Sequence, residues 1–391
     1  MTPTPIVQLV RTGSLLSVAG MAVAAVNLRS APRLRVPRRT FTEPVTVCIP
    51  ARNEVQRLPA LIEDLVGQRG IHDLRVLVFD DASTDDTAAA AEAACAGDPR
   101  FTVVRSTEEP LPGWVGKPAA CHRAYDRAQA LHPRRDGLLV FLDADVRLQP
   151  GALAAACSAL RESGAGLICP WPFQESGSIA EIAVQPLLAW SWAASLPVRL
   201  GNRSLRPSMA VACGQFMVFD SAAYRRAGGH GGVVNSLTED LDIARLLRRR
   251  GVSTHVVLAG GAATCRMYEN AAALRSGYDR WLWTAFGSRP GAVAAVSAGG
   301  MAYLVPPVAL ALGRGLVRRW GAVGYFAAVT SRLCARTLER GASPTATDVA
   351  GAVTHPLSVA ATAALIMSSH LAHHRGRTSW KGRALSSRGP E

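Results

Sequence analysis

Charged residues and lysine are both scarce in this sequence. Charged residues make up 18% of the 391-residue chain, against about a quarter in typical soluble domains. Lysine occurs only as Lys117 and Lys381, so the formal net charge of +14 comes almost entirely from arginine. Apolar residues make up 49%, which excludes a disordered chain and indicates segments that enter a membrane. Nucleic-acid-binding proteins can be this basic but are seldom this apolar, so we expect no nucleic-acid partner.

Several chemical motifs are also missing. The eight cysteines form no CxxC pair and most lie in apolar runs, which disfavours a zinc site or a disulfide framework. We expect buried, reduced thiols in a reducing compartment. No GxGxxG follows the first predicted strand and no GxxxxGK[ST] occurs, so dinucleotide dehydrogenases and P-loop enzymes are disfavoured.

An apolar run lies near the N-terminus. Residues 15–26 form its centre, residues 6–10 extend it backwards, and five arginines follow it, at positions 29, 33, 35, 38 and 39. A cleaved signal peptide would carry its positive charge before the apolar run. We therefore interpret residues 1–28 as an uncleaved anchor in the cell (inner or plasma) membrane, with the N-terminus outside and the next domain in the cytoplasm.

Three further apolar runs cover residues 291–313, 320–330 and 349–367, and Pro306-Pro307 is expected to kink the first. We assign residues 286–375 to a multi-pass membrane region and residues 376–391 to a basic tail. If the tail and the soluble domain are both cytoplasmic, an even number of spans separates them. The short middle run is then expected to be an interfacial or re-entrant piece.

Between these regions, short apolar runs alternate with helical patterns. We expect strands at 45–49, 74–79, 101–104 and 138–142, and helices at 55–66, 85–94 and 118–131. The alternation predicts an α/β domain with a mainly parallel, doubly wound sheet, in which ligands bind at the carboxyl ends of the strands. Residues 181–200 predict an amphipathic helix at the membrane interface with Trp190 and Trp192 at headgroup depth, or alternatively a core helix.

Acidic side chains follow two of these strands. Asp80 and Asp81 follow the second strand, and Asp143 and Asp145 follow the fourth. Mg²⁺ and Mn²⁺ prefer carboxylate oxygens and share their coordination shell with substrate phosphates. The pattern therefore predicts a divalent cation that holds a diphosphate, although Asp85 or Asp86 is expected only to cap the next helix.

Five segments occur in an order that resembles family 2 glycosyltransferases of the GT-A fold. They are PARNE (50–54), VLVFDDASTD (76–85), GKPAAC (116–121), LLVFLDADV (138–146) and TEDLDIARLLRRRG (238–251). The resemblance spans residues 43–285 and implies a GT-A domain with a Rossmann-like mixed sheet over residues 40–285. GWVGKP (113–118) and TSWKGR (378–383) look closer to a membrane branch that includes carotenoid- and hopanoid-associated glycosyltransferases.

The resemblance implies donor-site roles for individual residues. Asp81 would bond the base, with uracil expected, and Lys117 would approach the diphosphate or the acidic cluster. Asp145 would bind Mn²⁺ or Mg²⁺, and Asp143 would contact the ribose, the sugar or the metal shell. The nucleotide would be framed by Pro50, Ala51, Arg52 and Glu54.

The resemblance also implies the catalytic and acceptor residues. Glu239 and Asp240 match the acidic pair that supplies the catalytic base, with Asp240 preferred, although capping of the helix they open is an alternative. The acceptor would meet Arg280, Trp281, Gln215 and His230. Processive relatives carry QxxRW, but Gly277 stands where the glutamine would be, which disfavours processivity.

The sequence thus predicts an inverting, non-processive transferase that moves a sugar from a nucleotide sugar, with a UDP-sugar expected, to a lipid or isoprenoid hydroxyl at the bilayer. Three alternatives stay open. They are a polyprenyl-phosphate sugar synthase, a processive polysaccharide synthase, and an inactive nucleotide-sensing scaffold.

Overall fold

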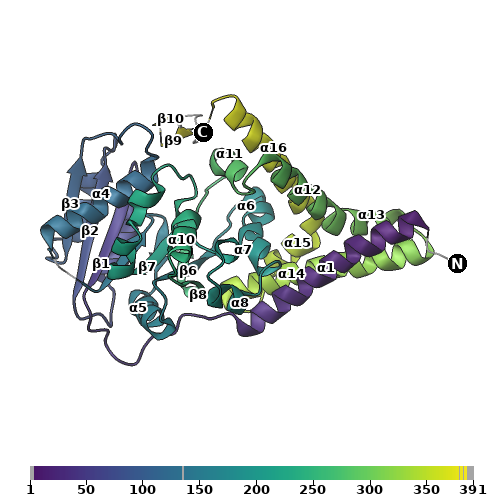
Figure 1. Ribbon diagram of the computed structural model, residues 1–391, viewed down its shortest axis with the longest axis horizontal. Coiled ribbons are helices and arrows are strands. Elements are labelled where there is room, and N and C mark those ends of the chain that lie inside the picture. The colour runs from purple at the N-terminus through teal and green to yellow at the C-terminus, as the bar shows by residue number, and fades with distance from the viewer. Residues whose placement is uncertain (1–3, 134–135, 378, 382, 385–391) are drawn as a thin grey trace.

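The computed structural model describes residues 4–133, 136–377, 379–381 and 383–384. Its centre is an eight-stranded sheet in the order β3-β2-β1-β4-β7-β6-β8-β5 (Figure 1). The first four strands are parallel, whereas β7 is antiparallel to both neighbours and β5 is antiparallel to β8. The predicted α/β sheet is confirmed, and it is mixed. The strands are β1 Val45–Ala51, β2 Leu74–Asp81, β3 Phe101–Ser106, β4 Leu138–Leu142, β5 Val146–Leu148, β6 Leu167–Gln174, β7 Phe216–Asp220 and β8 Thr254–Cys265.

Helices cover both faces of this sheet. One face packs against α2 (Leu58–Val66), α3 (Thr87–Cys95) and α5 (Ala152–Ser163). The other packs against α4 (Gly116–Leu131), α9 (Ser221–Arg226) and α10 (Glu239–Arg249). Strands buried on both faces are continuously apolar, which is why their runs are visible in the sequence. All eight cysteines lie in the described part of the chain and are free.

The register of the parallel strands brings their polar ends together. β1 pairs with β2 from Val45↔Leu74 to Ala51↔Asp80, and it pairs with β4 from Val45↔Leu138. Parallel strands in this register end at one edge of the sheet. The segments that follow β1, β2 and β4 therefore line a common edge.

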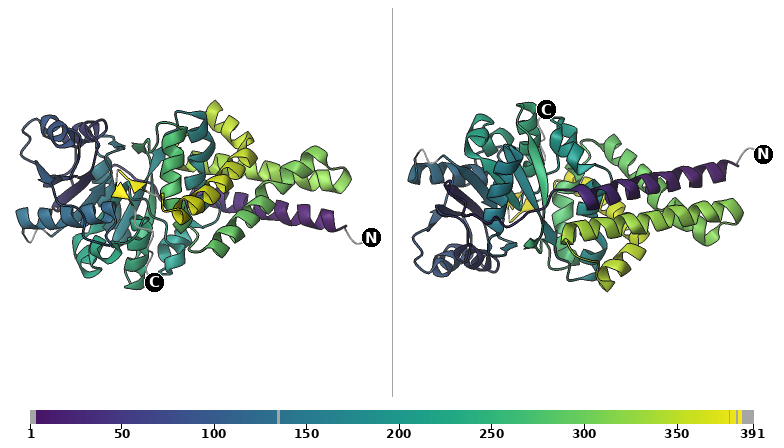
Figure 2. Two further views of the ribbon diagram at one scale, coloured as in Figure 1. Left: turned by 90° about the horizontal axis from the view of Figure 1, so that it is seen from above. Right: turned by 90° about the horizontal axis from the view of Figure 1, so that it is seen from below.

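Two long helices project from the sheet domain. α1 (Pro5–Ser30) and α14 (Gly315–Arg340) lie side by side in all views of Figures 1 and 2. α12 (Arg289–Tyr303) leads outward to α13 (Val305–Leu312), and the break between them at Leu304 precedes the prolines expected to kink this run. Among the described residues, α1 and the stretch Arg289–Leu312 are long and apolar enough to cross a membrane. The protein is therefore expected at a membrane.

The bend in the C-terminal region lies in the third apolar run. α15 (Ala346–Val353) and α16 (His355–His374) meet at 69°, and they raise the number of candidate spans to three if the pair counts as one. The middle run, expected to be the interfacial or re-entrant piece, instead lies within the continuous helix α14. That helix is not among the candidate spans found in the described residues.

Residues 179–203 form three short helices and not one interfacial helix. They are α6 (Ile179–Val184), α7 (Pro186–Ala193) and α8 (Val198–Arg203). Trp190 Nε1 donates to Ser331 Oγ on α14 at 2.9 Å, and Trp192 packs against Trp171 with 9% of its surface exposed. The expectation that both indoles lie at headgroup depth is wrong, because Trp192 is buried and Trp190 is half-buried against α14.

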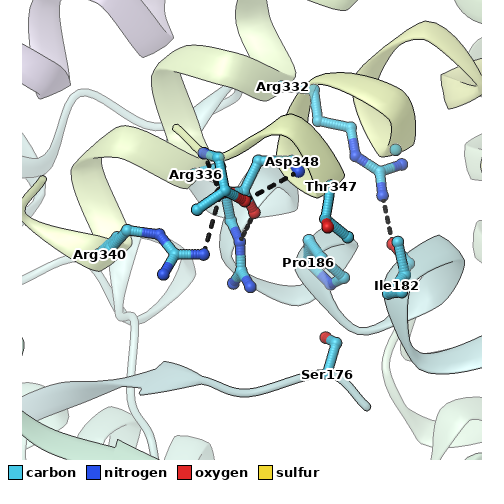
Figure 3. Close-up of a pocket in the computed structure, with 10 residues that line it drawn as sticks. Ser176, Ile182, Pro186, Arg332, Arg336, Arg340, Thr347 and Asp348 are labelled. Carbon is cyan, nitrogen blue, oxygen red and sulfur yellow. Dashed lines mark hydrogen bonds and ion pairs between the residues drawn. The ribbon is translucent and has the colours of Figure 1, made fainter. Parts of the chain in front are cut away.

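One face of α14 is bonded to the sheet domain through arginines at every fourth position (Figure 3). Arg332 Nη2 donates to Ile182 O at 2.8 Å, and Arg336 Nη1 donates to Gln174 O at 2.9 Å. Arg336 and Arg340 both donate to the carboxylate of Asp348, at 2.8 and 2.9 Å. The three arginines, Ile182 and Asp348 line a pocket of about 180 Å³ at the junction. The helices of the projection are thus tied to the end of β6 by charged hydrogen bonds.

Replacing Asp348 with asparagine should destabilise this junction. The carboxylate is 5% exposed and Arg336 is 7% exposed, so the variant removes one of the two carboxylates that pair with this buried guanidinium, the other being Glu339, and also the partner of Arg340. Breaking one partner of a buried pair costs roughly 3 kcal/mol. We expect a clearly lower melting temperature in detergent, measured by circular dichroism.

The matched control is Asp136→Asn, which breaks the exposed pair with Arg225, where Asp136 keeps 74% of its side-chain exposure. Such surface pairs contribute less than about 1 kcal/mol. Equal melting temperatures for the two variants would contradict a structural role for the buried pair.

Candidate active site

The loops that follow β1 and β2 are locked together. Asn53 and Ala82 both have left-handed backbones, with φ of 53° and 54°, which is uncommon for residues other than glycine. Asn53 N donates to Ser83 Oγ at 3.0 Å, and Thr84 N donates to Asn53 Oδ1 at 2.8 Å. These cross-loop bonds hold both turns in a fixed conformation, so the edge of the sheet is rigid before any ligand arrives.

Asp81 lies at the centre of this edge with none of its surface exposed. Its carboxylate accepts from Arg123 on α4 and from Arg383 near the C-terminus. Arg52 Nη1 donates to the backbone carbonyls of Asp81 and Ala82, each at 2.7 Å. Arg52 and Asp81, both predicted at the nucleotide, are therefore in direct contact.

A lysine joins two of the predicted acidic groups. Lys117, in the first turn of α4, donates from Nζ to Asp143 Oδ2 at 2.6 Å and lies 3.0 Å from Glu239 Oε1. Asp143 follows β4 and Glu239 opens α10, so three separate elements meet at one ammonium group. The side chains of Lys117 and Asp143 each keep 24% of their exposure, which leaves them open to a ligand.

The neighbouring Asp240 is oriented by backbone groups. Its Oδ2 accepts from Gly214 N at 2.8 Å, and its Oδ1 accepts from Leu241 N at 2.8 Å. A Cβ at position 214 would lie 3.0 Å from both Glu239 Oε1 and Lys117 Nζ. Glycine at 214 therefore lets the backbone approach the acidic pair closely. This role of Gly214 escaped the sequence analysis, because a glycine before a strand carries no distinctive pattern.

Burial and mutual repulsion shift the titration of this cluster. Burial, opposed by Lys117, raises the pKa of Asp143 to about 7, and burial together with Glu239 raises the pKa of Asp240 to about 6. Burial alone would lower the pKa of Lys117, but Asp143 and Glu239 raise it well above its usual value. Such shifted carboxyl groups are typical of sites that move protons near neutral pH.

Asp145 has the features of a metal ligand. Its Oδ1 is buried without a hydrogen-bond partner among the described residues, and burial raises the pKa of its carboxyl. No group of three His, Cys, Asp or Glu side chains that could hold a metal occurs in the described part of the chain. Mg²⁺ is commonly bound by only one or two carboxylates, with substrate phosphates and waters completing its shell. The donor set of Asp145 and Asp143 therefore fits such an ion.

The remaining residues predicted at the donor also lie at this edge. Pro50 and Ala51 are the last residues of β1, and Glu54 Oε1 accepts from Lys381 Nζ at 2.7 Å. Burial raises the pKa of Glu54 despite that partner. Arg123, Lys381 and Arg383 were not assigned to the site from the sequence. Only the rarity of lysine and the TSWKGR segment could have indicated two of them.

The predicted acceptor residues are more scattered. Arg280 and Trp281 are half-buried at the end of α11 (Ala271–Trp281). Gln215 is 4% exposed; its Oε1 accepts from Gln174, and its carbonyl accepts from Asp143 N. Gln215 is therefore a buried residue that supports the backbone of Asp143.

His230 is a core residue. It is 1% exposed, its Nδ1 lies 2.8 Å from Tyr224 Oη, and its ring packs against Phe141. Burial lowers the pKa of His230 to about 3. This placement contradicts the predicted acceptor contact at His230, because the aromatic side chains of the core enclose the ring.

Sequence families and a solved structure are similar to this chain in sequence and in fold. Residues 46–228 match the model of glycosyl transferase family 2, and residues 138–366 match that of glycosyl transferase family group 2. A mannosyltransferase of Pyrobaculum calidifontis, solved with GDP-Man and Mn²⁺, has a similar fold, with a TM-score of 0.52, 16% identity and coverage of 93% of this chain and 98% of that one.

Two curated relatives carry the name 4,4'-diaponeurosporenoate glycosyltransferase. The protein of Staphylococcus aureus is 25% identical over 381 residues, which are 94% of this chain and 95% of the relative. The protein of Staphylococcus haemolyticus is 28% identical over 237 residues, and this match spans 58% of each chain, less than two thirds of that relative.

The mixed sheet has the GT-A fold. The chain belongs to glycosyltransferase family 2, as its motifs predicted.

Replacing Lys117 with methionine should make stability depend more strongly on pH. At pH 5 Asp143, with a pKa of about 7, is mostly protonated and needs no counter-charge. Its raised pKa stabilises the folded state at low pH, and this contribution is lost as the pH rises through 7. Without Lys117 the pKa of Asp143 rises further, so the deficit of the variant should grow by roughly 1–2 kcal/mol between pH 5 and pH 8.5.

Thermal unfolding at both pH values measures this change. Lys117→Arg keeps the positive charge and should show a deficit that is nearly the same at the two pH values. A Lys117→Met deficit that is also independent of pH would show that the ammonium group does not stabilise the ionised carboxylate.

Proposed function

We propose that this protein transfers a sugar from a nucleotide sugar, with a UDP-sugar preferred, to an oxygen of a membrane lipid or isoprenoid. One observation carries the proposal. Lys117 brings Asp143 and Glu239 together at the carboxyl edge of the sheet, where Asp81 and Asp145 also lie. Groups that can bind the donor, stabilise the leaving group and accept a proton are thereby combined in one place.

Asp240 is the proposed general base. Its two carboxylate oxygens are oriented by backbone N–H groups, and a pKa of about 6 leaves it largely ionised at neutral pH. It takes the proton of the acceptor hydroxyl while the oxygen attacks the anomeric carbon and the bond to the nucleoside diphosphate breaks. One base without a second nucleophilic carboxylate suits a single displacement, which inverts the anomeric configuration.

The leaving group gathers negative charge that the site must balance. A Mn²⁺ or Mg²⁺ ion held by Asp145, with Asp143 beside it, would supply Lewis-acid stabilisation of the diphosphate. Lys117 faces the same region and adds a fixed positive charge. Arg52 and Asp81 frame the nucleoside, and both are already held by hydrogen bonds before the donor arrives.

A single transfer is favoured over processive synthesis. A Cβ at Gly277 would lie 2.2 Å from the ring of Tyr268, so the glutamine of the processive motif does not fit at this position. The apolar helices α1, α12 and α13 support an acceptor that is dissolved in the membrane. With the N-terminus outside, the sheet domain is cytoplasmic and draws its donor from the cytoplasm.

The names of the two curated relatives favour a second candidate acceptor. Both are named for 4,4'-diaponeurosporenoate, so an isoprenoid carboxylate is an alternative to a hydroxyl. A carboxylate is ionised at neutral pH and needs no base. The two acceptor classes therefore differ in how strongly they depend on Asp240.

The first experiment is a donor and acceptor panel with the protein in detergent. UDP- and GDP-sugars are offered with Mn²⁺ or Mg²⁺, with and without a lipid extract, an isoprenoid alcohol or an isoprenoid acid. We expect release of UDP that requires both a UDP-sugar and an acceptor and that is lost in Asp145→Ala. Asp126→Ala, an exposed carboxylate on α4, is the matched control.

Release of nucleotide only with a polyprenyl phosphate would instead support the lipid-phosphate synthase. Absence of turnover with every donor and acceptor would support the inactive scaffold. An α-linked product from an α-linked donor would contradict inversion.

The pH profile tests the role of Asp240. With an alcohol acceptor, kcat should fall about tenfold per pH unit below pH 6 and be level above it, since the base acts only when ionised. Asp240→Asn should lower kcat by about 10²–10⁴-fold, whereas Asp242→Asn on the same helix, where the side chain is 37% exposed, should change it little. Near-normal turnover of an isoprenoid acid by Asp240→Asn would identify the carboxylate as the acceptor.

A further inference from the structure

The chain's C-terminal segment reaches back to the donor site. β9 (Ser379–Trp380) and β10 (Arg383–Ala384) form a small antiparallel pair, and Figures 1 and 2 show it against the sheet domain, far from the N-terminus. More than 300 residues separate this pair from β1 and β2 in sequence. The segment belongs to the TSWKGR motif, which the glycosyl-transfer mechanism above leaves without a role.

Lys381 contacts the loop after β1. Its Nζ donates to Glu54 Oε1 at 2.7 Å and to Asn53 O at 3.2 Å, and its carbonyl accepts from Arg52 Nε at 3.3 Å. The backbone of Lys381 is left-handed, with φ of 46°, as a short hairpin turn requires. Arg52 and Glu54, both expected at the nucleotide, and Asn53 between them are thus held by one lysine.

Arg383 contacts the end of β2 and the segment that follows β3. It donates to Asp81 Oδ2 and forms an ion pair of 2.5 Å with Glu109 Oε2. Its Nη2 is buried and has no hydrogen-bond partner among the described residues. A buried guanidinium N–H without an acceptor is costly, so this donor group is available to an anion that enters the site.

The two lysines of the chain are both in the same site. Lys117 bonds Asp143 and Lys381 bonds Glu54, although arginine supplies every other basic residue apart from histidine. The edge of the sheet is otherwise rich in carboxylates, which repel a diphosphate. Lys381 and Arg383 add two positive charges there, and charge of this sign favours an anionic donor.

We propose that Lys381 and Arg383 form one wall of the donor site, where they position Glu54 and Asp81 and raise the affinity for a nucleoside diphosphate. This inference rests on the proposed function. It adds a binding element from the opposite end of the chain to a site otherwise built from the sheet domain. The C-terminal segment thereby becomes part of the enzyme's donor recognition and not a dispensable basic tail.

The test measures binding of UDP and GDP to the full-length protein in detergent, with Mn²⁺, by titration calorimetry. Lys381→Asn removes the ammonium group while asparagine tolerates the left-handed backbone, and Arg383→Gln removes the guanidinium. We expect each to weaken UDP binding by roughly tenfold, as the loss of a charged hydrogen bond does. Arg375→Gln and Arg377→Gln remove the same charge from exposed positions nearby and should bind UDP as the unchanged protein does.

Further readouts separate a donor-site role from a structural one. Lys381→Arg and Arg383→Lys keep the charge and should recover most of the affinity. In turnover, Lys381→Asn and Arg383→Gln should raise the donor KM by roughly tenfold and change kcat by less than about twofold. Added UDP should raise the melting temperature of each variant by less than it raises that of the unchanged protein, with each rise measured from that protein's own melting temperature without nucleotide.

Two results would overturn the proposal. If the unchanged protein binds UDP and both variants bind it equally well, the segment is not a wall of the site. If the variants bind UDP more tightly, the segment competes with the nucleotide. A failure of the unchanged protein to bind either nucleotide would instead overturn the proposed function, and this inference with it.

Discussion

The contact on which the site depends is the ammonium group of Lys117 between two carboxylates from distant elements. Asp143 follows β4 and Glu239 opens α10, so without the cation the two elements would bring like charges into a partly buried space. At the same separation, Coulomb repulsion between two carboxylates is several-fold stronger near a protein interior than in water. The lysine therefore lets the acidic residues approach closely enough to serve one substrate.

Much of the fold could be predicted, because its strands are buried on both faces and its acidic residues follow the strand ends. β1, β2 and β4 and the residues after them were predictable from the sequence, and the structure places those residues at one edge. Its failures have physical reasons. His230 lies in a glycine-rich stretch, which is typical of an exposed loop, but its imidazole packs among the aromatic rings of the core. Gly214 acts through the absence of a side chain, and the contacts of Arg123, Lys381 and Arg383 depend on tertiary structure.

The membrane region shows the same limit. Hydropathy identified the apolar runs, but it does not encode which of them bends or which arginines face inward. The arginines of α14 interrupt its apolar sequence, and they bond Gln174, Ile182 and Asp348. A reading based on hydropathy alone assigns them to solvent, whereas they are the groups that attach the helix to the sheet domain.

A continuous path of hydrogen bonds leads from that attachment to the catalytic edge. Arg336 bonds the carbonyl of Gln174, the Gln174 amide bonds Gln215, and the Gln215 carbonyl accepts from the backbone of Asp143. This path of hydrogen bonds, and not a flexible linker, therefore holds the site at a fixed distance from the apolar helices. For the membrane acceptor proposed above, this fixed distance would require the reacting oxygen to lie at one set distance from the portion of the acceptor that stays in the membrane. Acceptor choice would then depend on length as well as on chemistry.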